Sequence, residues 1–333
     1  MADEPPDEPA AQRKRDEDAL PPTIGGQVHV RYARSDLDTK PDEGELTLSR
    51  AKFELEWKPK KRLEAVVAAD LSPATEAGGG GVVPLDAYVQ VGASSWLAVR
   101  AGHRKIPFSG LRLQSLSSLP TIVRGEYARQ LDAVFHDEGS ADLAREVGLD
   151  LRLRAKSLAR LRLDIGVSQG EDGPKDVAAR ATVRPADGLE LGAALAVIHV
   201  FAVTNSAESQ RRALGEVDAA LDAGRWHAEV EAAIGDDDRT RGDRVFVAAY
   251  ALLSYRIAMG QKNTPALEPL LRFDAVDRGR GVADDHALAL TAGLNLHPRK
   301  HLRLMVDVER SERADAYGAP DETRLLSQLA FDI

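Results

Sequence analysis

The sequence predicts an all-β fold, a transmembrane antiparallel β-barrel of about sixteen strands, and three observations lead to it. Short segments that alternate strictly between apolar and charged residues recur along most of the chain. The connections between these segments alternate between short and long. No segment approaches the roughly eighteen consecutive apolar residues of a membrane-spanning helix. The longest apolar run, at residues 195–203, is interrupted by His199.

Residues 146–167 show the alternation most clearly. From Val147 to Leu153 every second residue is apolar, and the residues between them are glycine, aspartate or arginine. After a short polar break the same pattern resumes from Leu161 to Val167. Such alternation gives a strand one apolar and one charged face. Two strands of this kind joined by a tight turn form an antiparallel hairpin.

The same pattern continues from Gln27 to the C-terminus and defines the strands that we expect. They lie at residues 27–34, 45–57, 62–71, 84–91, 97–105, 145–154, 159–168, 176–184, 189–198, 212–222, 225–234, 244–255, 267–276, 286–297, 301–310 and 323–333. No helical periodicity competes over a comparable length.

The connections fall into two sets. The short ones are 58–61, 92–96, 155–158, 185–188, 223–224 and 298–300, and the long ones are 35–44, 72–83, 106–144, 169–175, 199–211, 235–243, 277–285 and 311–322. Short periplasmic turns and long extracellular loops are typical of bacterial outer-membrane barrels. An even strand count places both termini on the short-turn side. The alternation does not explain one connection, 256–266, which is longer than others of its set.

The apolar register is expected to face lipid and the charged register to enclose water. About ten residues tilted near 45° rise roughly 25 Å, which matches the apolar band of such barrels. The outward register includes Leu85 on an early strand and Leu325, Leu329 and Phe331 on the last one. The three tryptophans, Trp57, Trp96 and Trp226, fall at or beside short turns and predict an aromatic girdle at one membrane interface.

Composition narrows the class further. The chain of 333 residues has no cysteine, so a disulfide framework is excluded. Its net charge of −9 argues against nucleic acid as a partner. Residues 1–22 are acidic and proline-rich, and we expect a disordered leader before a single barrel at 23–333. No signal peptide follows Met1, so either the protein is cytoplasmic or the sequence starts at a mature N-terminus to which a methionine has been added, and the strand pattern favours the second.

Residues 101–109, Ala-Gly-His-Arg-Lys-Ile-Pro-Phe-Ser, and their continuation at 111–125 resemble the phosphate-selective porins O and P. That family carries a Gly-x-x-Lys-x-Pro-Phe-Ser segment that leads into its constriction loop. Residues 267–274 and 293–310 look like its late strands. The resemblance implies a sixteen-stranded, water-filled pore in the Gram-negative outer membrane, often a homotrimer, with the third long loop folded into the lumen. Here that loop is 106–144, the longest connection.

The ion selectivity of a porin depends on the charges that line the narrowest part of its pore. Guanidinium groups stay charged and point fixed donors at an oxyanion. The candidate pore-lining residues are Arg100, Arg104, Arg152, Arg154, Arg160, Arg162, Arg180 and Arg184 on the wall, Lys105, Arg112, Arg124 and Arg129 at the loop, and Glu229, Glu231 and Asp307 on an opposite acidic wall. We expect a transverse field between the two walls and a weak preference for anions, with phosphate among them. A charge-paired inner face without selectivity is the alternative.

Enzyme motifs are absent from the sequence. The eight histidines form no metal motif, and the glycine run at 78–81 lacks a Walker lysine. We therefore expect no enzyme, no cofactor and no metal, and lipid, small ions and hydrophilic solutes as partners. His227 and His297 fall in the inward register as wall residues. Two rival interpretations remain open: a soluble or secreted all-β binding protein whose apolar faces pack together, and an outer-membrane barrel that is not a channel.

Overall fold

The computed structural model describes residues 21–37, 44–60, 62–72, 82–135, 145–155, 157, 159–170, 175–201, 209–236, 244–260, 265–279, 284–314, 317 and 319–333. The leader expected at 1–22 lies almost entirely outside the described residues, as do parts of most long connections. Every strand that the sequence predicts is present in the described part.

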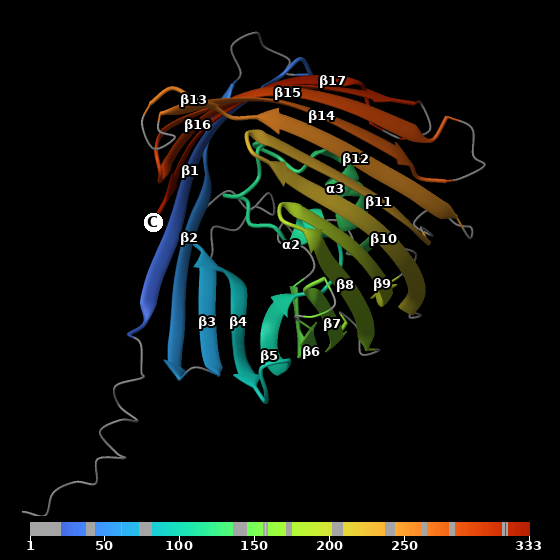
Figure 1. Ribbon diagram of the computed structural model, residues 1–333. Coiled ribbons are helices and arrows are strands. Elements are labelled where there is room, and N and C mark those ends of the chain that lie inside the picture. Colours follow the sequence, from blue (N-terminus) through green and yellow to red (C-terminus); the bar gives the residue numbers. More distant parts are fainter. Residues whose placement is uncertain are drawn as a thin grey trace, which may run out of the picture.

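The strands form one antiparallel sheet that closes into a barrel where β1 pairs with β17 (Figure 1). The wall strands are β1 (Thr23–Ser35), β2 (Glu45–Lys60), β3 (Leu63–Asp70), β4 (Val83–Gly92), β5 (Leu97–Lys105), β6 (Arg145–Ala155), β7 (Leu161–Ser168), β8 (Asp176–Ala186), β9 (Leu189–Phe201), β10 (Ser209–Ala223), β11 (Trp226–Asp236), β12 (Val245–Tyr255), β14 (Ala266–Asp277), β15 (His286–Arg299), β16 (Leu302–Arg313) and β17 (Glu322–Asp332). The expected sixteen-stranded barrel is confirmed.

A two-residue strand, β13 (Ile257–Ala258), accounts for part of the long connection at 256–266. β13 pairs with β14 along the same edge as β12 does, so β12 and β13 form one wall strand interrupted at Arg256. The backbone N–H of Met259 donates to the carbonyl of Pro265 at 2.8 Å. The hairpin therefore continues past Arg256, and its connection is shorter than the alternation indicates.

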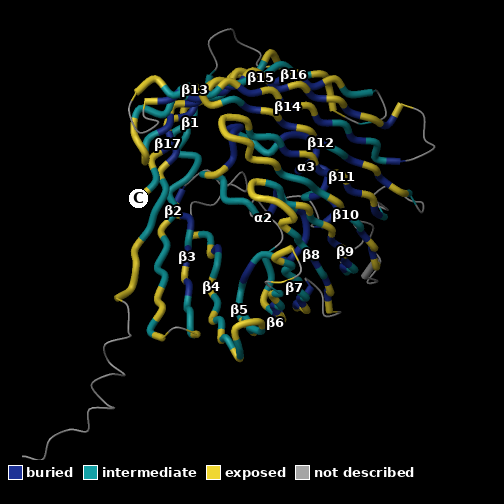
Figure 2. Tube along the Cα trace, in the orientation of Figure 1, coloured by how far each residue is buried: buried dark blue, intermediate teal, exposed yellow. Residues whose placement is uncertain are grey.

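The two faces of the wall differ as the alternation predicts. Large apolar side chains are exposed on the outside, and charged side chains on the inside are buried, which Figure 2 shows as bands of exposed and buried positions along the strands. This arrangement is the reverse of the soluble alternative, in which the leucine and valine rows would pack against one another. Lipid is the solvent that such an outer surface requires.

Leu85 is an exception to the outward assignment, and the prediction for it is wrong. Its side chain is only 1 % exposed. The pairing of β3 with β4 shifts by one residue between Val67 and Ala69, so the register of Leu85 is inverted relative to Val89 farther along β4. A one-residue shift exchanges the two faces of a strand.

The short turns lie at the end of the barrel that carries the three tryptophans. Gly188 and Gly224 adopt φ values of 80° and 66° in the turns after β8 and β10. Two-residue hairpin turns require positive φ, which glycine adopts without strain. All three tryptophans are exposed, and Trp226 contacts Tyr255 with ring centroids 4.6 Å apart. Within the described residues no helix is long and apolar enough to span a membrane.

The wall is not equally tall all around. Strands β3, β5 and β7 have 8 or 9 residues, whereas β9, β10 and β15 have 13 to 15. Figure 1 shows the short strands together on one side of the barrel. We call the side formed by β3 to β7 the low side of the barrel and the side formed by β9 to β17 the tall side.

Candidate functional site: the lumen and its inner loop

The connection between β5 and β6 folds into the barrel. Its described part, residues 106–135, is called the inner loop below, and it carries α2 (Gly110–Leu113) and α3 (Gly125–Phe135). Figure 1 shows both helices inside the ring of strands. The third long loop therefore lies in the lumen, as the family resemblance implied, whereas its two helices were not predicted.

The inward turn begins within the segment Lys-Ile-Pro-Phe-Ser. Phe108 is buried, and its ring lies 5.2 Å from the ring of Phe135 at the end of α3. Ser109 adopts a φ of 63°, and its Oγ accepts a hydrogen bond from the backbone N–H of Arg112 at 3.2 Å. This bond satisfies one of the free donors at the start of α2. Burial of Phe108 and the turn at Ser109 direct the chain away from β5 and into the lumen.

An apolar seat on the inner face of the tall side receives α3. Tyr127, Leu131 and Val134 recur at the helical spacing of four and three residues, and all three are 0 % exposed. The inward side chains that form the seat are Ala178, Ala194, Ala196, Ile198, Leu214, Ala233, Phe246, Ala248, Tyr250, Leu252, Val276 and Ala287. Several of these strands are apolar on both faces, which was the sequence signal that another element covers the inner one.

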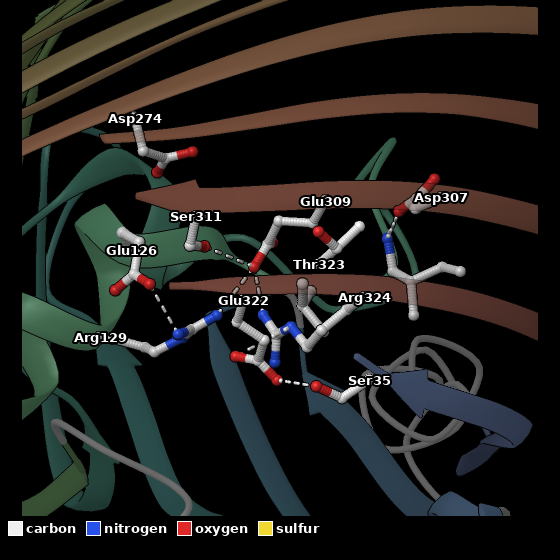
Figure 3. A network of polar contacts seen from close by, with 12 residues as sticks. Ser35, Glu126, Arg129, Asp274, Asp307, Glu309, Ser311, Glu322, Thr323 and Arg324 are labelled. Atoms are coloured by element: carbon white, nitrogen blue, oxygen red, sulfur yellow. Dashed lines mark hydrogen bonds and ion pairs between the residues drawn. The ribbon is translucent and has the colours of Figure 1, made fainter. Parts of the chain in front are cut away.

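Carboxylates on β11 and β16 hold the loop by hydrogen bonds. Asp307 Oδ2 accepts from the backbone N–H of Ile122 at 2.7 Å (Figure 3). Glu231 accepts from the backbone N–H of Leu111 at 2.8 Å and from the hydroxyl of Tyr127 at 2.7 Å. Burial, together with the charge of Glu231, raises the pKa of the Tyr127 phenol well above its usual value. This hydroxyl therefore remains a donor.

An ionic network fixes the start of α3 near the seam of the barrel (Figure 3). Arg129 contacts Glu126 at 2.8 Å and Glu309 of β16 at 3.0 Å. Arg324 of β17 pairs with the same Glu309, and Arg313 Nε donates to Glu126 at 3.1 Å. Both carboxylates are almost completely buried. Removal of one cation would leave a buried charge without its full set of partners.

The acidic wall does not face open water, which corrects the expectation for Glu229, Glu231 and Asp307. All three point into the barrel, but they are only 5, 3 and 0 % exposed. Glu229 accepts from Gln114 Nε2 at 2.8 Å and from the hydroxyl of Tyr250 at 3.0 Å. The inner loop covers these carboxylates and uses them as acceptors. A transverse field across the pore water cannot include them at full strength.

The open space lies between the inner loop and strands β2 to β9. A cavity of about 1060 Å³ is bounded on the loop side by residues 113–116, called the rim below. Among the described residues, twelve basic and three acidic side chains line it. The basic ones are Arg50, Lys52, Arg100, Lys105, Arg124, Arg145, Arg152, Arg154, Arg160, Arg162, Arg180 and Arg184, and the acidic ones are Asp86, Asp164 and Glu190.

Many of these cations have acidic partners. Arg180 contacts Glu216 at 2.9 Å and Asp218 at 2.7 Å, and Arg152 contacts Asp164 at 2.9 Å. Further ion pairs join Arg50 to Asp70, Lys52 to Glu54, Arg145 to Asp86, Arg160 to Asp187, Arg162 to Asp164 and Arg184 to Glu190. Arg100 and Arg154 differ from these, because neither has an ion pair within the part of the chain that the structure describes.

A neutral amide joins two guanidinium groups of the wall. Gln90 Oε1 accepts from Arg152 Nη1 at 2.6 Å and from Arg100 Nη2 at 3.4 Å. The guanidinium of Arg100 also lies 4.4 Å above the ring centroid of Tyr88. The Nε of Arg100 is buried and has no hydrogen-bond partner among the described residues. At least one N–H donor of the guanidinium groups beside Gln90 therefore has no hydrogen-bond acceptor among the described residues.

A second cavity of about 930 Å³ extends the basic lining toward the short turns. It is lined by Lys58, Lys60 and Arg62 and shares Arg152 and Arg154 with the first cavity. The basic surface therefore continues along the low side toward the short-turn mouth.

Three of the arginines predicted for the pore lining lie elsewhere. Arg104 is completely buried and pairs with Asp150, Arg112 contacts Asp132 at 3.1 Å, and Arg129 belongs to the network at α3. None of the three lines either cavity. Arg104 has the inward register predicted for it but is buried in an ion pair, whereas Arg112 and Arg129 belong to the inner loop and are paired with carboxylates there.

Several cavity residues escaped the sequence prediction. Tyr88 and Gln90 lie in the inward register of β4, so the alternation contained their signal. Arg145 lies in the outward register at the start of β6, yet it lines the cavity and its Nε lies 3.2 Å from Asp86. Residue parity assigns such a strand end to the wrong face.

The inward histidines pair with carboxylates. His227 contacts Asp222 at 2.7 Å and Glu229 at 2.9 Å, and His297 contacts Glu268 at 2.8 Å. Within the described ranges no group of three or more histidines and acidic residues could hold a metal ion. Both histidines are parts of the wall.

Comparisons with known proteins agree with this architecture. The family model described as phosphate-selective porin O and P matches residues 23–186, which span β1 to β8. No curated protein matches the sequence significantly.

Solved structures of outer-membrane channels resemble the whole barrel. An anion-selective porin from Comamonas acidovorans is 14 % identical with a TM-score of 0.68, over 94 % of this chain and 99 % of that one. The outer-membrane channel DcaP of Acinetobacter baumannii is 13 % identical with a TM-score of 0.66, over 94 % and 97 %. The trimer form of OmpT, an outer-membrane protein of Vibrio cholerae, is 10 % identical with a TM-score of 0.65, over 94 % and 99 %. At these identities the likeness shows the fold alone.

A closed sixteen-stranded barrel with a loop in its lumen, together with the family match, defines the class: this chain is a porin of the Gram-negative outer membrane. Over its first eight strands it matches the phosphate-selective porin O and P family, as the segment Lys-Ile-Pro-Phe-Ser indicated. Porins are channels and not enzymes.

Proposed function

We propose that the chain is a passive diffusion channel for small hydrophilic solutes and ions, with a preference for anions. One observation carries the proposal. The inner loop covers the carboxylates of the tall side, and the open cavity is lined by twelve basic and three acidic side chains. A charged lining concentrates counter-ions and lowers their barrier to entry.

The wall suits rapid passage better than tight binding. Most of its arginines keep a carboxylate partner, which offsets their charge without removing their remaining donors. Between Arg100 and Arg152 the amide oxygen of Gln90 occupies a position that an oxygen of a passing anion could take. Hydrogen bonds from guanidinium to an oxyanion are charge-assisted and stronger than those to an amide. An anion can exchange with Gln90 and move on to Arg154.

We extend the proposal to phosphate as one of the permeant anions. The family description names phosphate, and the wall offers several guanidinium groups with donors at different angles, which suits a tetrahedral oxyanion. Phosphate is proposed here as a solute that passes with the other small anions.

A reversal-potential measurement tests the proposal. The purified protein is inserted into a planar bilayer between a concentrated and a dilute potassium chloride solution, and then between potassium phosphate solutions. We expect a reversal potential of the sign for anion permeation in both salts. Clear cation selectivity would refute the anion preference, and the absence of any conductance would support a plugged barrel instead.

We also propose that the channel is a homotrimer with its low side at the centre. One structural neighbour is described as a trimer form. The outward positions of the short strands include Ala65, Ala87 and Ala101, which permit close approach of a second wall. Light scattering of the protein in detergent, with the detergent mass subtracted, measures the state. The mass of a single chain would contradict the trimer.

A further inference from the structure

Lys105 is the basic residue of the family segment Gly-x-x-Lys-x-Pro-Phe-Ser, and the sequence suggests that its charge faces the pore. In the structure its ammonium group is bound to the inner loop. Nζ donates to the backbone carbonyls of Arg112 at 2.7 Å, Leu113 at 3.3 Å and Gln114 at 2.9 Å. An ammonium group has three N–H donors. These three carbonyls are sufficient to use all of them.

The bound carbonyls belong to the C-terminal end of α2. The last carbonyls of a helix have no partner within the helix and need donors from outside. Arg124 Nη2 supplies another donor to the carbonyl of Gln114 at 3.0 Å. Two cations therefore hold the backbone at the point where α2 ends and the rim begins.

The rim has other attachments among the described residues, and one of them is apolar, since Leu116 packs against the core cluster that holds α3. Gln114 Nε2 donates to Glu229 on β11, and Gln27 Nε2 on β1 donates to the hydroxyls of Ser115 at 3.2 Å and Ser117 at 2.9 Å. These contacts join the rim to the tall side and to the seam. Lys105 is the contact that joins it to the end of β5, on the same wall that carries Arg100.

We propose that Lys105 is a positioning residue, which holds the rim at a fixed distance from the arginine-lined wall and so determines the width of the pore. Its ammonium group does not contact the permeating ion. The inference rests on the proposed channel function and adds the residue that controls its size limit. A residue that acts through width affects neutral solutes, whereas a residue that acts through charge affects ions.

Uptake of neutral sugars separates these two roles. Liposomes that contain the protein swell when a sugar enters, and a series of sugars of increasing size gives the size limit. For Lys105→Met we expect severalfold faster swelling with the larger sugars, because the rim is released, and an intermediate result for Lys105→Arg. Arg154→Met is the matched control, since it also removes one positive charge from the cavity. We expect it to lower the anion-to-cation permeability ratio and to change sugar uptake much less than Lys105→Met does.

The result that would overturn the inference is unchanged sugar uptake in Lys105→Met together with a loss of anion preference as large as in Arg154→Met. If the protein is no channel, the unmodified protein itself gives no swelling, which distinguishes failure of the proposed function from failure of this inference. Heat-modifiable migration in a detergent gel reports whether each variant has folded. If Lys105→Met does not fold, Arg124→Met carries the test, because it removes the second donor to the carbonyl of Gln114. We then expect swelling with the larger sugars to become faster, but by a smaller factor.

Discussion

The tall and the low side of the barrel follow the same alternation but enclose different interiors. On the tall side, inward carboxylates and small apolar residues receive the inner loop, so that Glu231 and Asp307 are buried beneath it. On the low side, inward arginines such as Arg100 and Arg154 line open cavities. The difference shows that an inward charge in a barrel has two possible roles. An inward carboxylate that accepts hydrogen bonds from backbone N–H groups anchors a loop. An inward cation that is exposed to water lines the pore.

The hydrogen-bonding needs of its backbone explain why the inner loop docks on the tall side, where the inward carboxylates lie. A backbone that enters the lumen brings N–H donors and carbonyl acceptors that need partners. Carboxylates accept several donors at once, as Glu231 does from Leu111 and Tyr127. Guanidinium groups offer only donors. Where they contact this loop they hold its carbonyls, as Arg303 does at 2.6 Å from the carbonyl of Leu119.

The largest effect is expected at the seat of α3. Tyr127 is completely buried against Tyr250, with ring centroids 5.2 Å apart. The substitution Tyr127→Ala removes this ring and a donor to Glu231, and large-to-small changes at buried aromatic sites cost about 3–5 kcal/mol. We expect the loop to leave its seat, the single-channel conductance and its noise to rise severalfold, and the loop to become sensitive to protease.

Phe273→Ala is the control for this change. Phe273 is an exposed outward residue of β14, so its loss should leave conductance and protease resistance nearly unchanged. Equal effects of the two substitutions would mean that the seat does not hold the loop, and the contrast between the two sides would lose its basis.

Two arginines of β16 allow an ion pair inside the barrel to be compared with one on its outer surface. Arg313 is nearly buried and contacts Glu126 of α3, whereas Arg310 is exposed and contacts Asp321 at 3.4 Å. Removing one partner of a buried pair costs about 3 kcal/mol or more, and an exposed pair contributes about 0–1 kcal/mol. We expect Arg313→Ala to lower the unfolding midpoint in urea clearly and to increase current noise.

Arg310→Ala should change neither quantity measurably. If it destabilised the barrel as much as Arg313→Ala does, the position of an arginine relative to the wall would not determine its contribution.

The sequence predicts the wall much better than the interior. Alternation places strands and faces because a lipid-facing register must be apolar, and it fails at irregularities such as Leu85 and at strand ends such as Arg145. It cannot separate Arg100 from Arg104, since both have inward register and only their contacts in the folded barrel distinguish them: Arg104 is buried in an ion pair with Asp150, and Arg100 lines the cavity. The seat had a weak signal in β12, where the inward Phe246 and Ala248 are apolar like the outward Val247. That signal shows that something covers the inner face, but not which segment does so.

On the low side, Arg100 should have the clearest effect on selectivity. Its guanidinium has no acidic partner within the described residues, and its charge lies beside the path. One charge roughly 15 Å from an ion at an effective dielectric constant of 20 stabilises an anion and destabilises a cation by about 1 kcal/mol each before salt screening, which reduces both values. We expect Arg100→Gln to reduce the chloride-to-potassium permeability ratio by about fivefold at 0.1 M salt. The effect should shrink at 1 M salt, where the Debye length is about 3 Å.

Arg160→Gln provides the comparison, because the side chain of Arg160 is 63 % exposed at a short turn. Its removal should change the permeability ratio less than that of Arg100 at both salt concentrations. If the two substitutions had the same effect, only the net charge of the mouth would matter, and the wall would have no particular role.

The smallest effect is expected at the border between the two sides, where Arg180 is held by Glu216 and Asp218. Asp218→Asn keeps the shape of the side chain, which matters because an added Cβ at Gly192 would lie only 2.1 Å from Asp218 Oδ2. It removes one of two opposing charges from an arginine that lines the cavity, so anion preference should increase by less than about 1 kcal/mol, since Glu216 remains. The reversal potential at 0.1 M salt measures this gain. Asp187→Asn is the matched control, because Asp187 is 92 % exposed and its charge is screened by solvent. An increase only in Asp218→Asn would place Arg180 on the pore side of the border, whereas no change would assign the pair to the interior that anchors the loop.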